Sequence, residues 1–229
     1  MRVAIHQPEH LPWLGYFAKM DAADLLVHLD DVQFEKNYFQ NRNRVADVSG
    51  RPFWLTVSLA LPQGHLTRIR DALLLEPRTW LKSYFGRLDH ALGATRFVDE
   101  VMEWLVPKLE TESKLAELNL NLIQDVATSL GICTPSRRSS ELRTSQSKSD
   151  RLLEILRDCS ATEYLIGRGS LGYLDFPKFR RASIDVVLVE YAVTENFSSD
   201  GRPLSVLQYL CNSGLEGSPP SYQLSKVDL

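Results

Sequence analysis

The start of the chain constrains the fold most, because two short apolar runs flank a helical segment. Residues 2–5 form the first apolar run and are predicted to be a buried strand that ends at the polar His6. Residues 12–22 have helical spacing, and residues 25–29 form the second apolar run. The order strand, loop, helix, strand is typical of a parallel sheet with a right-handed crossover. We therefore predict an α/β fold with a parallel-containing sheet and a Rossmann-like, nucleotidyltransferase-like opening.

A β-hairpin and a helical region are predicted in the middle of the chain. Residues 44–48 and 53–57 alternate apolar and polar side chains on either side of a glycine turn, which is typical of a β-hairpin insertion. Helical spacing then predicts three helices, at residues 78–91, 96–105 and 114–130. Gly131 should end the last of these helices as a C-cap. Residues 78–131 are thus expected to form a helical subregion.

The last third of the chain is predicted to return to the sheet. Residues 137–146 are rich in Ser, Thr and Arg and are predicted to be a loop. Residues 149–159 have the pattern of an amphipathic helix, with Ser149 as its N-cap. Three further elements are expected: strands at residues 163–166 and 185–191, and a helix at residues 205–212.

Length and charge bound the class of protein. The 229 residues suffice for one large α/β domain, so we expect a single domain over residues 1–229, with a loose tail at about residues 215–229. A net charge of -3 gives no general attraction to nucleic acid. No apolar stretch approaches the roughly 20 residues of a membrane helix, so we expect a cytoplasmic protein with no membrane partner. The wide spacing of the cysteines predicts no metal site.

His6, Asp30 and Asp31 are the predicted catalytic residues, because each follows a predicted strand. Ligands of parallel sheets bind outside the carboxyl ends of the strands. His6 could protonate a leaving oxygen or hold an oxyanion, or it could instead donate to a nearby carbonyl and stiffen the loop. Successive side chains point to opposite faces, so one of the two aspartates should enter the cleft. That aspartate could bind Mg²⁺ or act as a base, and the alternative is a turn or cap role.

The candidate substrate-binding residues lie on several loops and helix starts. A helix beginning near Pro12 presents free N–H groups that suit a phosphate or carboxylate oxygen. The loop at residues 33–43 carries planar amides and cations for anions or sugar hydroxyls, unless it is only a solvated loop. The start of the predicted helix near residue 149 and the glycines after residue 166 are further candidates. The predicted substrate-binding residues are Gln7, His10, Trp13, Gln33, Lys36, Asn41, Arg42, Asn43, Lys148, Ser149, Gly167 and Tyr173.

Several ordered motifs resemble those of one known family. The motifs are His6-Gln7-Pro8, residues 12–17, Asp30-Asp31-Val32-Gln33, Gln40-Asn41-Arg42-Asn43, residues 148–153 and residues 164–167. They resemble the motifs of the WbqC-like family, and the likeness covers nearly the whole chain. The last helix departs from the family pattern, because Leu207-Gln208 stand where the family has an Asp after Ser-Val.

The resemblance implies a transferase of surface-polysaccharide biosynthesis, such as that of the lipopolysaccharide O-antigen, or of natural-product biosynthesis. The implied reaction forms an amide by acyl or aminoacyl transfer, for example glycyl transfer, to an amino sugar or related amine. The activated donor would be an adenylate, a thioester on a carrier protein or an aminoacyl-tRNA. The acceptor would be a small-molecule amine such as an amino-sugar nucleotide.

Two other functions remain open at the level of sequence. The opening is also similar to that of pantothenate synthetase and the cytidylyltransferases, with residues 147–149 resembling their later Lys-Ser motif. Residues 10–13 of this chain stand where those enzymes have a His-x-Gly-His motif, and Trp13 occupies the position of its second histidine. A nucleotidyltransferase that uses a nucleoside triphosphate is therefore the first alternative. Because no complete catalytic triad is evident, a non-catalytic binding module of a biosynthetic complex is the second.

Overall fold

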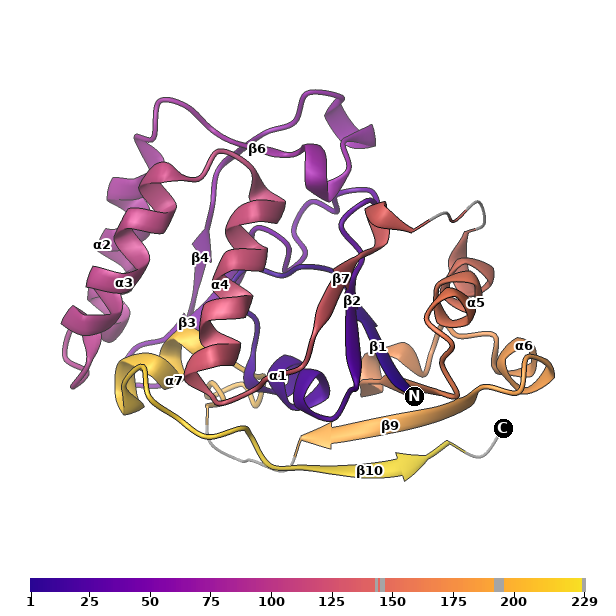
Figure 1. Ribbon diagram of the computed structural model, residues 1–229. Coiled ribbons are helices and arrows are strands. Elements are labelled where there is room, and N and C mark those ends of the chain that lie inside the picture. The colour runs from indigo at the N-terminus through magenta and orange to yellow at the C-terminus, as the bar shows by residue number, and fades with distance from the viewer. Residues whose placement is uncertain (143, 145–146, 192–195, 228–229) are drawn as a thin grey trace.

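A central sheet of six strands organises the chain (Figure 1), whose computed structural model describes residues 1–142, 144, 147–191 and 196–227. The strands are β1 (Arg2–His6), β2 (Leu25–His28), β7 (Ser136–Arg138), β8 (Glu163–Ile166), β9 (Asp185–Tyr191) and β10 (Tyr222–Lys226). Their spatial order is β10-β9-β8-β1-β2-β7. The pairs from β9 to β7 are parallel, whereas β10 runs antiparallel to β9.

The predicted opening of the fold is confirmed. The chain passes from β1 through helix α1 (Leu14–Asp21) into β2, and these strands pair in parallel from Val3 opposite Leu25 to His6 opposite His28. Within the described residues the mostly parallel sheet is joined by two antiparallel hairpins and seven α-helices. The chain is thus a mixed α/β protein, as predicted.

The first strand lies at the point where the direction of strand addition reverses. From β1 the chain moves to β2 and β7 on one side, and later to β8 and β9 on the other. The loops that leave β1 and β8 therefore diverge at the carboxyl edge of the sheet. Open α/β sheets bind their ligands in the crevice at such a switch point.

The middle of the chain follows the predicted pattern, although its second helix continues to Thr111, six residues past the predicted end. The hairpin pairs β3 (Arg42–Ala46) with β4 (Pro52–Thr56), and a shorter one pairs β5 (Leu59–Ala60) with β6 (Leu73–Leu74). The helices of this region are α2 (Trp80–Leu92), α3 (Val98–Thr111) and α4 (Leu115–Ser129). Gly131 has a φ of +72°, which confirms it as the residue that ends α4.

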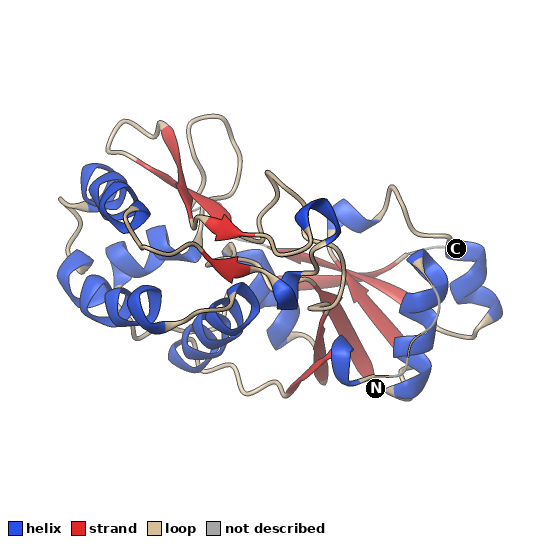
Figure 2. Ribbon diagram, turned by 90° about the horizontal axis from the view of Figure 1, so that it is seen from above, coloured by secondary structure: helices blue, strands red, loops and turns tan. Residues whose placement is uncertain are grey.

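Helices cover both faces of the sheet (Figure 2). The later helices are α5 (Lys148–Asp158), α6 (Phe176–Arg181) and α7 (Val206–Ser213). Side chains of β1 alternate between the two faces, since Ala4 joins the large core with α1, α4 and α7, whereas Val3 and Ile5 join a smaller core under α5 and α6. This alternation sends His6 and His28 to the face that α1 and α4 cover.

Three local predictions are corrected by the structure. Helix α5 begins at Lys148, so Ser149 lies inside its first turn and accepts a hydrogen bond from the Asp175 N–H at 3.2 Å instead of capping the helix. The segment predicted to be a loop, residues 137–146, begins in strand β7, which pairs with the otherwise free edge of β2. Residues 143 and 145–146 of this segment lie outside the described residues. The tail, predicted to be loose, contains strand β10, because the edge of β9 offers unpaired backbone groups. Residues 228–229 of the tail lie outside the described residues.

Candidate active site

The loop after β1 carries the central residue of the candidate site, His6. Its Nδ1 lies 3.1 Å from the Gln7 carbonyl oxygen and 3.9 Å from a carboxylate oxygen of Glu9. Its ring stands edge-on to Tyr16 of α1, with 4.8 Å between the centroids. Because a carbonyl only accepts, Nδ1 carries the ring proton and Nε2 keeps a free lone pair. The side chain is 28% exposed, so part of it is open to solvent.

Electrostatics keep His6 neutral. Burial lowers the pKa of His6 well below its ordinary value, and the nearby Lys19 and His28 lower it further. A neutral imidazole with an unprotonated Nε2 is a hydrogen-bond acceptor rather than an acid. The geometry therefore suits orientation of an N–H or O–H group better than protonation of a leaving oxygen.

Two buried charged residues that sequence reasoning did not select lie beside His6. Glu9 is 5% exposed and Lys19 is 6% exposed. Burial raises the pKa of Glu9 to about 7, against the opposing effect of Lys19. Burial also lowers the pKa of Lys19 to about 8, against the opposing effect of Glu9. Both groups can therefore change charge near neutral pH, which is a property of catalytic acids and bases.

One sequence signal could have found this pair. Lys19 follows Tyr16 by three residues in a helix whose other central residues are apolar, so it lies on the buried face. Glu9 lies between the motifs His6-Gln7-Pro8 and residues 12–17. Charged residues are almost never fully buried unless they are paired.

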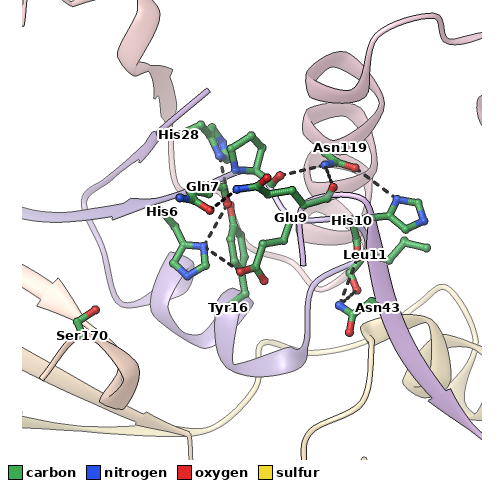
Figure 3. A network of polar contacts seen from close by, with 12 residues as sticks. His6, Gln7, Glu9, His10, Leu11, Tyr16, His28, Asn43, Asn119 and Ser170 are labelled. Carbon is green, nitrogen blue, oxygen red and sulfur yellow. Dashed lines mark hydrogen bonds and ion pairs between the residues drawn. The ribbon is translucent and has the colours of Figure 1, made fainter. Parts of the chain in front are cut away.

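Tyr16 connects His6 to the end of β2. Its hydroxyl lies 3.2 Å from Nδ1 of His28 (Figure 3). Burial and the nearby Arg138 lower the pKa of His28 to about 4, so this second histidine is also neutral. The two imidazoles thus flank one tyrosine on the same face of the sheet.

A buried amide network holds the loop that carries these residues (Figure 3). Asn119 of α4 donates to the carbonyls of Pro8 at 2.9 Å and Gln40 at 2.7 Å. The Gln40 side chain in turn donates to the Gln7 side chain at 2.8 Å. Three segments that are distant in sequence are thereby tied together behind His6.

His10 and Asn43 belong to the same buried network. His10 is fully buried, with Nδ1 3.3 Å from the Asn119 oxygen and Nε2 2.9 Å from the Tyr84 hydroxyl. Asn43 donates to the carbonyls of His10 and Leu11 at 3.2 and 2.9 Å. Both side chains are enclosed and bonded within the protein, and the substrate-binding role predicted for them stays a prediction.

Asp30 and Asp31 follow β2, and their hydrogen-bond partners lie after β7 and on α5. Asp30 is buried and accepts from the Ser140 N–H at 3.0 Å, the Ser140 hydroxyl at 2.7 Å and the Ser139 hydroxyl at 3.2 Å. Asp31 accepts from the Ser139 hydroxyl and from Arg151 of α5. Burial pushes the pKa of Asp31 up, but these two hydrogen bonds, the charge of Arg151 and a backbone hydrogen bond together hold the pKa below its ordinary value. Both carboxylates make contacts of the kind expected for the alternative turn or cap role. A catalytic role for either stays a prediction.

The predicted ligand residues of the 33–43 loop contact the neighbouring protein. Gln33 donates to the His65 carbonyl at 2.6 Å, and Asn41 donates to the Val57 carbonyl at 2.8 Å. Arg42 lies over the Trp54 ring, 4.0 Å from its centroid. Lys36 is exposed. In the same loop, burial and then the charge of Glu9 raise the pKa of Tyr38, with a further contribution from Tyr173.

The remaining predicted ligand residues follow β8 or stand at the starts of α1 and α5. Gly167 precedes a short helical turn, Arg168–Ser170, at the end of β8, and the exposed Tyr173 contacts the Ser170 hydroxyl at 3.0 Å. Ser170 lies on the His6 side of the network (Figure 3). Trp13 packs edge-on to Tyr191 at 5.6 Å, and Lys148 is exposed at the start of α5.

Comparison with known proteins identifies the family. The profile of the WbqC-like protein family matches residues 7–218. The chain belongs to the WbqC-like protein family. It is 30% identical over 227 residues to the uncharacterized protein Rv1507c of Mycobacterium tuberculosis, and the alignment covers 96% of each chain. No solved structure matches it. Membership of the WbqC-like family is consistent with a biosynthetic enzyme.

The matched WbqC-like region contains Glu9, Tyr16, Lys19 and His28, and it begins directly after His6. Within the described residues, no group of three or more His, Cys, Asp or Glu side chains is arranged to hold a metal ion. Across the same residues, none of the helices combines the length and the apolar character needed to cross a bilayer.

Proposed function

We propose that this protein is an amide-forming transferase that moves an acyl or aminoacyl group, for example glycyl, onto the amine of an amino sugar or a related compound. Membership of the WbqC-like family supports a biosynthetic role, in surface-polysaccharide or natural-product pathways. The proposal is carried by two buried charged residues at the switch point of the sheet: Glu9, 3.9 Å from His6, and Lys19, whose charge acts on both Glu9 and His6.

Glu9 is the proposed base in place of the aspartates. An amine reaches the enzyme as an ammonium ion and must lose a proton before it attacks an acyl carbon. A carboxylate with a pKa of about 7 is a better proton acceptor than an ordinary one and is still ionised in half or more of the molecules at neutral pH. The unprotonated Nε2 of His6, whose ring lies beside Glu9, orients the same amine by accepting one of its N–H groups.

Lys19 is the proposed stabiliser of negative charge. Attack of the amine on the activated carbonyl forms a carbon–nitrogen bond and places a negative charge on the carbonyl oxygen. A cation held in a buried site stabilises such an oxyanion more strongly than one in water. The nitrogen of this intermediate loses its surplus proton to water, the intermediate collapses to the amide as the bond to the leaving oxygen or sulfur breaks, and Glu9 returns its own proton to the leaving group.

An activity assay tests these roles. The protein is incubated with activated glycine as an adenylate, a thioester or an aminoacyl-tRNA, together with amino-sugar nucleotides, and the amide is detected by mass spectrometry. Glu9→Gln and His6→Gln should each lower turnover by about 10²- to 10⁴-fold, and Lys19→Met by about 10²-fold or more. The surface substitutions Glu110→Gln, His65→Gln and Lys82→Met serve as matched controls and should leave turnover unchanged. Absence of product with every donor, or full activity of Glu9→Gln, contradicts the proposal.

Nucleotidyl transfer is a second candidate, favoured by the switch point between β1 and β8. Such sites commonly accept nucleotides in open α/β sheets. Release of pyrophosphate from a nucleoside triphosphate, dependent on His6 and on an added acceptor, would establish this reaction in place of amide formation. Binding of an amino-sugar nucleotide without turnover of any donor would instead favour a non-catalytic binding module.

A further inference from the structure

A cavity separate from the His6 loop lies between helix α4 and the edge strand β7, which run side by side in Figure 1. Its volume is about 220 Å³. The residues that line it are His28, Leu120, Asn121, Ile123, Gln124, Ser136, Arg137, Arg138 and Glu141. Pockets that bind drug-sized ligands have volumes of roughly 300–1,000 Å³, so this cavity suits a smaller molecule.

The lining combines both signs of charge with a small apolar surface. Arg138 holds Glu117 through two hydrogen bonds of 2.6 and 2.9 Å, which leaves three of its five N–H groups for other acceptors. Glu141 supplies a carboxylate three residues further along the chain. Leu120 and Ile123 supply the apolar part. A ligand that matches this lining carries an anion, a cation and a short apolar group.

His28 adds a hydrogen-bond donor at the inner end of the cavity. Burial keeps the pKa of Tyr16 well above its ordinary value, so the phenol keeps its proton and can donate to Nδ1 of His28 at 3.2 Å. Nε2 then carries the ring proton. Within the described part of the chain, this nitrogen makes no hydrogen bond. A ligand in the cavity can supply the missing acceptor.

We propose that this cavity binds a small zwitterion of the α-amino acid class. The carboxylate of the ligand accepts hydrogen bonds from Arg138 and from Nε2 of His28, its ammonium group pairs with Glu141, and its side chain contacts Leu120 and Ile123. Charge-assisted hydrogen bonds of this kind are stronger than neutral ones. The proposal rests on the cavity and its lining, and it does not depend on the transferase reaction at Glu9.

Calorimetric titration with three matched probes tests the chemistry of the ligand. L-alanine carries both charged groups, propionate lacks the ammonium group and ethylamine lacks the carboxylate. L-alanine should bind at least about tenfold more tightly than either analogue, which is the effect of one lost charge-assisted hydrogen bond. Equal binding of propionate and L-alanine, or no heat with any probe, overturns the proposal.

Paired substitutions locate the binding. Glu141→Gln should weaken L-alanine binding by about tenfold, and Gln124→Trp, which fills the cavity from α4, should abolish it. Glu110→Gln and Gln63→Trp, both on exposed surface away from the cavity, should bind as the unmodified protein does. His6→Gln should also retain binding, which separates this site from the proposed active site. Binding that survives Gln124→Trp in a folded protein, or that His6→Gln removes, overturns the assignment to this cavity.

Discussion

The ring of Tyr16 stands edge-on to the imidazole of His6, with 4.8 Å between the two centroids. Tyr16 is nearly inaccessible and belongs to the large core, so the histidine of the candidate site rests on a core residue rather than on a mobile loop. The hydroxyl of the same tyrosine contacts His28 at 3.2 Å. A site built on packed elements of this kind holds its side chains in place before a ligand arrives.

The raised pKa of Glu9 predicts a pH-dependent gain in stability on Glu9→Gln. In the unfolded chain this carboxyl loses its proton near pH 4.5, whereas in the folded protein it does so near pH 7. The folded state therefore holds the extra proton between these values, and the free energy of unfolding falls as pH rises through this window. At pH 8, Glu9→Gln should raise the free energy of unfolding by up to about 3 kcal/mol, and at pH 4 it should change little. Urea unfolding at both pH values measures the difference; equal effects would show that Glu9 titrates normally.

The amide network behind His6 predicts a large cost for Asn119→Ala. The substitution leaves the buried carbonyls of Pro8 and Gln40, and Nδ1 of His10, without their partner. Two or three unpaired buried groups cost about 2–5 kcal/mol of unfolding free energy. Asn121→Ala on the exposed side of the same helix loses only a contact to Glu112 and should cost under about 0.5 kcal/mol. Similar melting temperatures for the two variants would contradict the role of Asn119.

The hydrogen bonds to Asp31 predict acid sensitivity. Because its pKa is lowered in the folded state, Asp31 stabilises the fold above its unfolded pKa of about 3.8, and this contribution is lost as pH falls through the folded value. Asp31→Asn should reduce the free energy of unfolding at pH 7 by about 1–3 kcal/mol and make the remaining stability less dependent on pH below 4. Exposed Asp99→Asn is the control. If Asp31→Asn removed turnover with no loss of stability, the originally predicted catalytic role would be favoured.

Replacing a helical glycine by alanine should have opposite effects on stability in α1 and in α2. A Cβ at Gly15 would lie 2.2 Å from the Trp13 ring, and that ring packs against Tyr191, so Gly15→Ala must displace it. Overpacking of this kind costs about 1–3 kcal/mol. In α2, a Cβ at Gly86 meets no atom within 4 Å, so Gly86→Ala should stabilise the protein by about 0.5–1 kcal/mol through helix propensity. Thermal unfolding of both variants checks the two signs.

Local sequence pattern was enough to place the framework of the site. The short apolar run before His6 and the helical spacing that follows it predict β1, α1 and β2 in parallel, and these elements form as expected. Pairing in the hairpin and the end of α4 at Gly131 also follow from neighbouring residues. The paired residues of these features lie no more than 22 positions apart, as Val3 and Leu25 do, so the local order of side chains records them.

The partners of the site residues could not be read in the same way. Asp30 meets Ser140, which is 110 positions away, and Asn119 reaches Pro8 across 111 positions. Edge strand β10 likewise forms only because β9 offers it a free edge. Contacts over such separations depend on how the whole sheet and its helices pack.

The sequence by itself determined that His6 ends a buried strand at the carboxyl edge of a parallel sheet, because hydrophobic periodicity and chain connectivity are local properties. Only the tertiary structure decided which charged residues are removed from water. Glu9 and Lys19 owe their altered pKa values to the surrounding α1 and loop atoms, whereas Asp30 and Asp31 are turned toward Ser139, Ser140 and Arg151. Desolvation depends on every neighbour that packs around a group, so it emerges only when the chain is folded.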